Sequence, residues 1–248
     1  RRVPMNNKIS HKYNVLVSLK RVFTLLLALF ILQGEQRAIA QNGDDLVPEA
    51  FVELQEFIPT IQVELRYFSA NNFVGNVVDG YHAEQVFMTR EAAEALAKVQ
   101  AEVAAFGLSL KVFDAYRPQR AVDHFVRWAQ DLDDTKMKAV FYPAVAKDIL
   151  FSEGYISARS GHTRGSTIDL TLVDGNTGEE LDMGSPWDFF DPVSWPSNLN
   201  LTAQARANRS LLAAAMTKHG FRAIRTEWWH FMLADEPFPD TYFDFPIE

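Results

Sequence analysis

The stretch Gly165-Ser-Thr-Ile-Asp-Leu-Thr-Leu-Val173 alternates between apolar and polar side chains and predicts a β-strand. Successive side chains of a strand point to opposite faces of its sheet. Ile168, Leu170 and Leu172 therefore share one face, and Asp169 points to the other. The stretch predicts a sheet that presents Asp169 on the face opposite its apolar residues.

Helix and strand signals follow one another irregularly on both sides of this strand. The helix signals are apolar residues at helical spacing, opened by Thr or Pro and closed by Gly. We predict helices at 89–107, 118–132, 135–150 and 202–220, and further strands at 108–113 and 221–233. Because no regular strand-helix-strand rhythm appears, we predict an α+β fold. It would be a single domain with an antiparallel or mixed central sheet flanked by helices.

His162, Asp169 and His230 are candidate ligands of one metal ion at this sheet. A glycine at 165 permits a tight approach from His162 into the strand, so a loop residue and a strand residue can converge. Two neutral imidazoles and one carboxylate suit zinc, although iron, cobalt or manganese could bind similar ligands. The alternative is that His162 caps a turn, Asp169 is an ordinary polar residue and His230 is a buried core histidine.

Two charged residues could act beside such a metal. Glu227 adjoins two tryptophans, and poor solvation raises the pKa of a carboxyl group toward the working range of a general base. Its position three residues before His230 gives the two side chains opposite parity, which predicts a bend or bulge at 226–228. Arg117 precedes Pro118 in a turn, where Asp114 could orient it to hold an oxyanion. The alternatives are surface or structural ion pairs.

The other histidines compete poorly as ligands. His124 falls on a predicted helix, and His219 lies near a helix C-terminus, where positive charge is favoured. His82 follows Asp79 in a predicted loop and is the strongest rival. The histidine pattern therefore favours 162 and 230 and keeps 82 as an alternative.

Residues 1–40 have the pattern of a signal peptide. A basic region precedes the apolar run 22–32, and Ala38-Ile-Ala40 supplies a cleavage site. The run is about half the roughly 20 residues that cross a bilayer. We therefore predict export with cleavage near Ala40 and no stable membrane anchor afterwards. Residues 41–47 are predicted to be a flexible lead-in, and 48–248 to be the functional domain.

Net charge and cysteine content exclude several classes of binding partner and of covalent anchor. Residues 1–40 hold seven of the 24 basic residues and one of the 32 acidic residues, so the remainder has a net charge of −14. Such an acidic chain has no electrostatic footprint for nucleic acid or anionic lipid. The chain contains no cysteine, which excludes disulfides and a lipid anchor on a cysteine. The sequence does not predict the oligomeric state.

With these motifs assembled, the chain resembles the D-alanyl-D-alanine dipeptidases, zinc enzymes related to the D,D-carboxypeptidases and to hedgehog-type domains. The resemblance runs from about Phe51 to Phe245. It includes the motif Ser160-x-His162-x-x-Gly165-x-x-x-Asp169 and the stretch Glu227-Trp-Trp-His230. Val63-Glu-Leu-Arg-Tyr67, Asn71-Asn-Phe73-x-Gly75 and Asp79-Gly-Tyr81 are similar to the dipeptidase branch in particular.

This resemblance implies specific roles for individual residues. One zinc ion per chain would be held by His162, Asp169 and His230, with Glu227 as the catalytic base and Arg117 stabilising the transition state. The implied substrate contacts are Tyr67, Ser160 and Asp188, where Asp188 pairs with the dipeptide's amino group. Thr167 departs from the family pattern, which usually has alanine there. The implied reaction is hydrolysis of D-Ala-D-Ala that comes from peptidoglycan turnover, and the predicted leader would place it outside the cytoplasm, in a periplasm.

Two other functions share the same metal motif. One is a D,D-carboxypeptidase or endopeptidase acting on longer wall peptides. The other is a zinc-stabilised binding domain without catalysis, against which the presence of both Glu227 and Arg117 argues. An open groove in place of a closed pocket would favour the carboxypeptidase.

Overall fold

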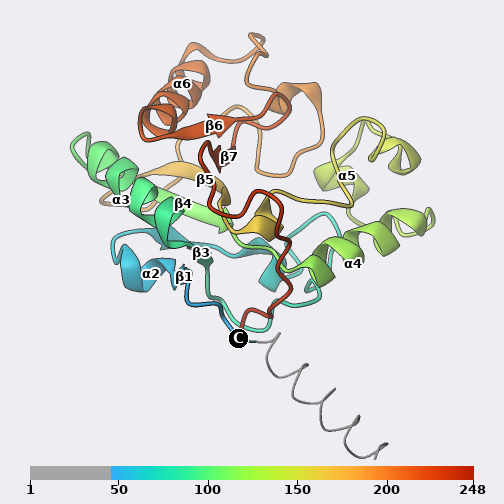
Figure 1. Cartoon of the computed structure of the whole chain (residues 1–248). Coiled ribbons are helices and arrows are strands. Elements are labelled where there is room, and N and C mark those ends of the chain that lie inside the picture. Colours follow the sequence, from blue (N-terminus) through green and yellow to red (C-terminus); the bar gives the residue numbers. More distant parts are fainter. Residues whose placement is uncertain (1–45) are drawn as a thin grey trace, which may run out of the picture. The chain divides into compact units, whose positions relative to one another are not determined.

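The strand containing Asp169 is the middle strand of a five-stranded sheet in the computed structural model, which describes residues 46–248 (Figure 1). The strand order is β2-β4-β5-β7-β6. β2 and β4 are parallel, and the other neighbours are antiparallel, so the sheet is mixed. The strands are β2 (Gln62–Val63), β4 (Leu108–Asp114), β5 (Thr167–Asp174), β6 (Phe221–Ala223) and β7 (His230–Leu233). β1 (Phe51–Glu53) and β3 (Phe87–Thr89) form a second, two-stranded sheet.

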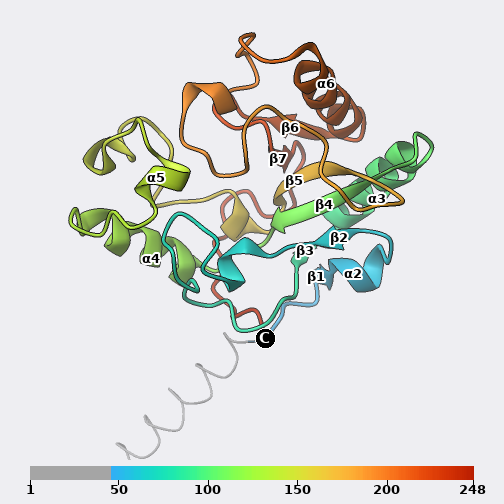
Figure 2. The same ribbon diagram turned by 180° about the vertical axis from the view of Figure 1, so that it is seen from behind.

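Two long helices pack against the central sheet. α3 (Arg90–Ala104) contacts β4, α6 (Ala203–Lys218) contacts β5 and β6, and the two helices touch each other. α4 (Gln119–Gln130) and α5 (Lys138–Phe141) lie on the opposite side of the domain in both views (Figures 1 and 2). A short α2 (Leu54–Phe57) follows β1. The predicted α+β architecture with a mixed sheet flanked by helices is confirmed.

Three of the four predicted helices begin at the residues that the sequence indicated, Thr89 for α3, Pro118 for α4 and Thr202 for α6. Thr202 opens α6 by accepting a hydrogen bond on Oγ1 from the Ala205 amide at 3.0 Å. Pro118 stands at the N-cap of α4. The predicted helix at 135–150 is wrong: only α5 and a 3-10 turn at Lys147–Ile149 form. Pro143 explains this break, because the residue before a proline is driven out of helical geometry.

The predicted single strand at 221–233 is also wrong. β6 and β7 are two antiparallel strands, joined by a loop at 224–229. Trp228 and Trp229 lie in this loop and are both buried. Glu227 precedes them in the same loop. The irregularity predicted at 226–228 takes the form of this loop and is larger than a bulge.

A bulge does occur in β4, at Phe113. Val112 pairs with Leu170, but Asp114 pairs with Asp169, so β4 has one extra residue there. The extra residue turns Asp114 to the sheet face that carries Asp169. The site described below depends on this shift.

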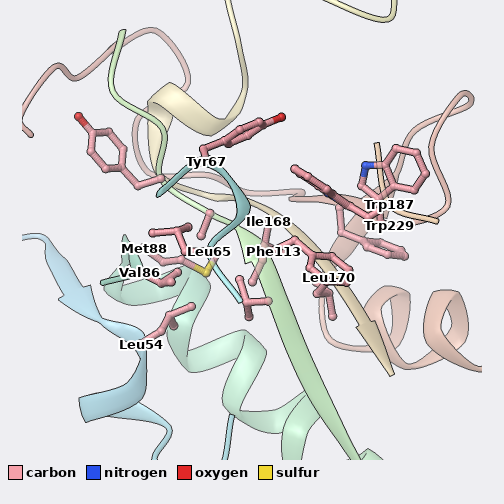
Figure 3. Close-up of a cluster of buried hydrophobic side chains, with 14 of the residues drawn as sticks. Leu54, Leu65, Tyr67, Val86, Met88, Phe113, Ile168, Leu170, Trp187 and Trp229 are labelled. Atoms are coloured by element: carbon pink, nitrogen blue, oxygen red, sulfur yellow. The ribbon is translucent and has the colours of Figure 1, made fainter. Parts of the chain in front are cut away.

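The core is a continuous cluster of apolar side chains drawn from strands and helices. Met88 of β3, Phe113 of β4 and Leu170 of β5 belong to it (Figure 3). Tyr67 and Trp187 are part of the same cluster; Tyr67 also lines the pocket, and Trp187 is hydrogen-bonded to Asp169. The packed interior therefore fixes residues on which the site depends.

Residues 46–248 include no helix that is long and apolar enough to span a membrane. The predicted leader at 1–40 and residues 41–45 of the predicted lead-in lie outside the described residues. Residues 47–248 form one compact unit.

Candidate metal centre and substrate pocket

His162 begins a 3-10 turn (His162–Arg164) that leads into β5. Gly165 ends the turn with φ +81°, a left-handed conformation that glycine adopts without strain. A Cβ atom at this position would lie 2.3 Å from the Phe51 ring. Only glycine therefore lets the chain pass from the turn into the strand while Phe51 stays in the core.

Asp169 and His230 are directly opposite each other on β5 and β7. His162 approaches the same point from the preceding turn. Its Nε2 lies 3.2 Å from Nδ1 of His230 and 3.3 Å from Oδ1 of Asp169. Nδ1 of His230 lies 3.1 Å from the same oxygen. The structure thus brings all three predicted ligands together.

The donor set fits a metal ion. The Nδ1–H group of His162 donates a hydrogen bond to the Ala115 carbonyl at 2.7 Å, which leaves Nε2 as a free lone pair facing the site. Oδ1 of Asp169 is buried and accepts no hydrogen bond within the described residues. One donor atom from each of the three residues lies within 4.8 Å of the others. Two nitrogens and one carboxylate oxygen, with a side left open, are the ligands of a catalytic zinc site.

Protonation also favours binding of a cation. Burial lowers the pKa of His162, so its imidazole is neutral, as a metal ligand must be. Burial acts to raise the pKa of Asp169, but the neighbouring His162 and His230 outweigh it and hold that pKa well below its usual range. The site therefore presents an ionised carboxylate between two imidazoles.

Glu227 reaches this centre from the β6–β7 loop. Its Oε2 lies 3.4 Å from Nδ1 of His230, and its side chain is 13 % exposed. Burial, and secondarily the charge of Asp169, raise the pKa of Glu227 to about 8. A carboxyl group with this pKa can both accept and return a proton near neutral pH.

Arg117 is held by Asp114, as the sequence predicted. Its Nε donates to Oδ2 of Asp114 at 2.9 Å, and Nη2 lies 3.9 Å from Oδ2 of Asp169. The guanidinium also stands over the rings of Tyr67 and Phe125, with Cζ 5.0 and 5.2 Å from their centroids. It is therefore fixed at the edge of the metal centre.

Asp188 and Tyr67 form a second polar group. The Tyr67 hydroxyl donates to Oδ2 of Asp188 at 2.7 Å. Burial raises the pKa of both side chains well above their usual values, and their mutual interaction adds to the rise for Tyr67. Asp188 has φ +55°, the only positive φ outside glycine in the described residues. Such conformations are often found at functional sites.

These groups line one pocket with a volume of about 160 Å³. All eight predicted site residues contribute to its wall. Ser160 accepts a hydrogen bond on Oγ from the His162 amide at 3.2 Å, which leaves its hydroxyl proton available to a ligand. Tyr155, Ile156 and Phe190 add an apolar wall. The arrangement can bind a small molecule that has charged ends around a polar centre.

Sequence reasoning missed two residues that support the site. Trp187 Nε1 donates to Oδ2 of Asp169 at 3.3 Å, and the Tyr81 hydroxyl donates to Oδ1 of Asp114 at 2.6 Å. Trp187 is next to Asp188, which is the one signal that could have indicated it. His82, the rival ligand, is exposed and lies outside the metal cluster.

Comparisons with known proteins agree with this chemistry. Residues 48–248 match the D-ala-D-ala dipeptidase family of peptidases. The D-alanyl-D-alanine dipeptidase of Streptomyces coelicolor is 42% identical over 197 residues, which cover 79% of this chain and 98% of the relative. The corresponding enzyme of Enterococcus faecalis is 41% identical with the same coverage. That of Escherichia coli is 35% identical over 73% of this chain and 83% of its own.

Solved structures show weaker likeness. A mutant of the vancomycin resistance D,D-pentapeptidase VanY in complex with Zn(II) is 13% identical, with a TM-score of 0.38 over 62% of this chain and 76% of its own. The vancomycin resistance D,D-dipeptidase VanXYg, in complex with a D-Ala-D-Ala phosphinate analog, is 16% identical, with a TM-score of 0.31 over 75% of this chain and 67% of its own. The assignment to a family comes from the sequence relatives.

Proposed function

Because the chain belongs to the D-ala-D-ala dipeptidase family of peptidases, we propose that it hydrolyses D-alanyl-D-alanine to two molecules of D-alanine. One zinc ion per chain would be held by His162, Asp169 and His230. The observation that carries this proposal is the convergence of these three ligands with Glu227 and Arg117 in one small pocket.

When bound, zinc would polarise the peptide carbonyl and lower the pKa of a water molecule. Glu227 accepts a proton from the attacking water, whose oxygen forms the new bond to the carbonyl carbon. Arg117 is a donor for the oxygen that gains negative charge. The C–N bond then breaks, and Glu227 returns the proton to the departing amine, so the base is regenerated.

The pocket provides recognition for a zwitterionic substrate. Asp188, oriented by the Tyr67 hydroxyl, is placed to bind the free amine, and Ser160 can donate to a polar group of the dipeptide. Tyr155, Ile156 and Phe190 add an apolar wall to the pocket beside these groups. The volume of about 160 Å³ supports a small substrate such as a dipeptide.

We also propose that the enzyme acts outside the cytoplasm, in a periplasm. The signal-peptide pattern of residues 1–40 supports this location. At that location its role would be to degrade free D-Ala-D-Ala that comes from wall turnover.

The proposal is tested by measuring D-alanine release from D-Ala-D-Ala, L-Ala-L-Ala and N-acetyl-D-Ala-D-Ala, with and without a chelator. We expect turnover of the free D,D-dipeptide, little turnover of the blocked one, and loss of activity on chelation that zinc restores. Faster cleavage of a muramyl pentapeptide would instead support a carboxypeptidase. Bound zinc without turnover of any peptide would support a binding domain.

A further inference from the structure

Arg209 of α6 is a buried cation that forms no close ion pair with a carboxylate within residues 46–248. Its hydrogen bonds all go to neutral acceptors. Burial lowers its pKa to about 10, and the more distant charge of Asp182 opposes this shift. Removing a guanidinium from water is costly unless each donor finds a partner. The acceptors are the carbonyls of Met183 at 2.6 Å, Val193 at 3.0 Å and Trp195 at 3.2 Å, and Oγ of Ser185 at 3.2 Å. All four belong to the segment 183–195, which carries Asp188.

The same segment is tied to the loop that carries Glu227. Trp228 Nε1 donates to Oγ of Ser185 at 3.0 Å, and the Trp228 amide donates to the Ser194 carbonyl at 3.1 Å. The Ser185 and Ser194 hydroxyls are hydrogen-bonded to each other at 2.9 Å. Arg209 lies over the Trp228 ring, with Cζ 5.7 Å from its centroid. Arg209 therefore contacts both the Asp188 segment and the neighbour of Glu227.

The backbone conformation of Asp188 requires such support from its surroundings. Its φ of +55° is unfavourable for a residue with a side chain, and it persists only where the surroundings enforce it. Tyr67 holds the carboxylate but not the main chain. Arg209 binds the segment at 183 and 185 before Asp188, and at 193 and 195 after it. One side chain thus fixes both ends of the strained segment.

We propose that Arg209 is a positioning residue, which holds the amine-binding carboxylate of Asp188 at a set distance from the catalytic loop. This inference rests on the proposed function. Arg209 does not line the pocket with Asp188 and Glu227, so it acts through other residues. Its loss should loosen recognition of the substrate's amine more than it slows bond cleavage.

The test compares D-Ala-D-Ala with N-propionyl-D-alanine, which has the same peptide bond but no amine. The ratio of their kcat/KM values measures amine discrimination. We expect Arg209→Met to lower this ratio at least tenfold, mainly by raising KM for the dipeptide. Arg209→Lys should restore part of it, because an ammonium can still donate to one or two of the carbonyls. In an Asp188→Asn background, Arg209→Met should change the ratio little, since the amine contact is already lost.

Gln100→Leu is the matched control. Gln100 is another buried polar side chain on a helix, and it bonds to Thr60, Ser109 and the Leu110 amide, away from the pocket. Its loss should lower the melting temperature without changing the ratio. If Arg209→Met does not fold, the ratio of the two kcat/KM values is measured on Arg209→Lys and Ser194→Ala instead.

Two results would overturn the inference while leaving the proposed function intact. One is an unchanged ratio in the folded Arg209 variants; the other is an equal loss of activity toward both substrates, which indicates general damage. A wild-type enzyme inactive on both substrates would overturn the proposed function and the inference together.

Discussion

At the residue scale, the convergence of the three candidate ligands could be predicted because their chemistry is local. His162 and Asp169 share one short motif, and His230 is the histidine beside a candidate base. Their supporting partners could not be predicted. Tyr81 reaches Asp114 across 33 residues of sequence, and that pairing exists only once β4 has folded with its bulge.

Glu227→Gln tests the base directly. The amide cannot accept the proton, so we expect kcat to fall by about 100- to 10,000-fold while the protein keeps its zinc. D-alanine release and metal content of the purified protein provide the two measurements. The exposed Glu179→Gln should change neither. Loss of zinc along with activity in the Glu227 variant would mean that Glu227 is a ligand.

Substitutions at Gly161 and Thr167 should have non-additive effects on the free energy of unfolding. A Cβ atom at 161 would lie 2.7 Å from Oγ1 of Thr167, an oxygen that is buried and makes no hydrogen bond in the described residues. We expect Gly161→Ala to cost about 1–3 kcal/mol through overpacking. Thr167→Ala should recover much of that loss.

The measurement is chemical unfolding of the two single variants and the double variant. Thr167→Ala alone should be close to neutral, because it removes an unpartnered hydroxyl. Additive effects in the double variant would show that the two side chains do not meet.

At the element scale, capping residues predicted helix ends, but tertiary burial overrode two other expectations. Thr202 and Pro118 determined where α6 and α4 begin. The predicted strand at 221–233 is a hairpin whose loop carries two adjacent buried tryptophans, and the periodicity of the sequence did not reveal this loop. The bulge in β4 was likewise invisible in the sequence, because it exists only relative to β5.

The junction between the His162 turn and β5 gives a prediction at this scale. Gly165→Ala should destabilise the protein by more than Gly107→Ala, although both positions have positive φ. At 107 a Cβ meets nothing within 4 Å, so the cost is the left-handed strain of about 1–2 kcal/mol. At 165 the clash with Phe51 adds to it and displaces His162.

Thermal unfolding and zinc affinity should therefore both worsen for Gly165→Ala, and zinc affinity should be unaffected by Gly107→Ala. Equal effects of the two substitutions would show that Phe51 can move aside at little cost.

At the scale of the whole molecule, fold class could be predicted but strand order could not. The parallel pairing of the two-residue β2 with β4 leaves no trace in sequence periodicity. The candidate metal site, by contrast, is a property of the assembled sheet, since its three residues come from β5, β7 and the turn before β5.

Metal removal should therefore lower global stability. A ligand at one hundred times its dissociation constant stabilises the folded state by about 2.7 kcal/mol. We expect chelation to lower the melting temperature and added zinc to restore it. His230→Ala should abolish this response, and the exposed His82→Ala should retain it. If the change in melting temperature depended on His82 and not on His230, His82 would be the third zinc ligand.

The position of β7 between β5 and β6 has a consequence for biosynthesis. The candidate metal ligands at 162 and 169 leave the ribosome some sixty residues before the third, at 230. A growing polypeptide consequently cannot complete its coordination sphere until β7 has emerged and inserted between its neighbours. Catalytic competence would then arise late, in a single step, and a chain stalled before β7 has emerged would be inert.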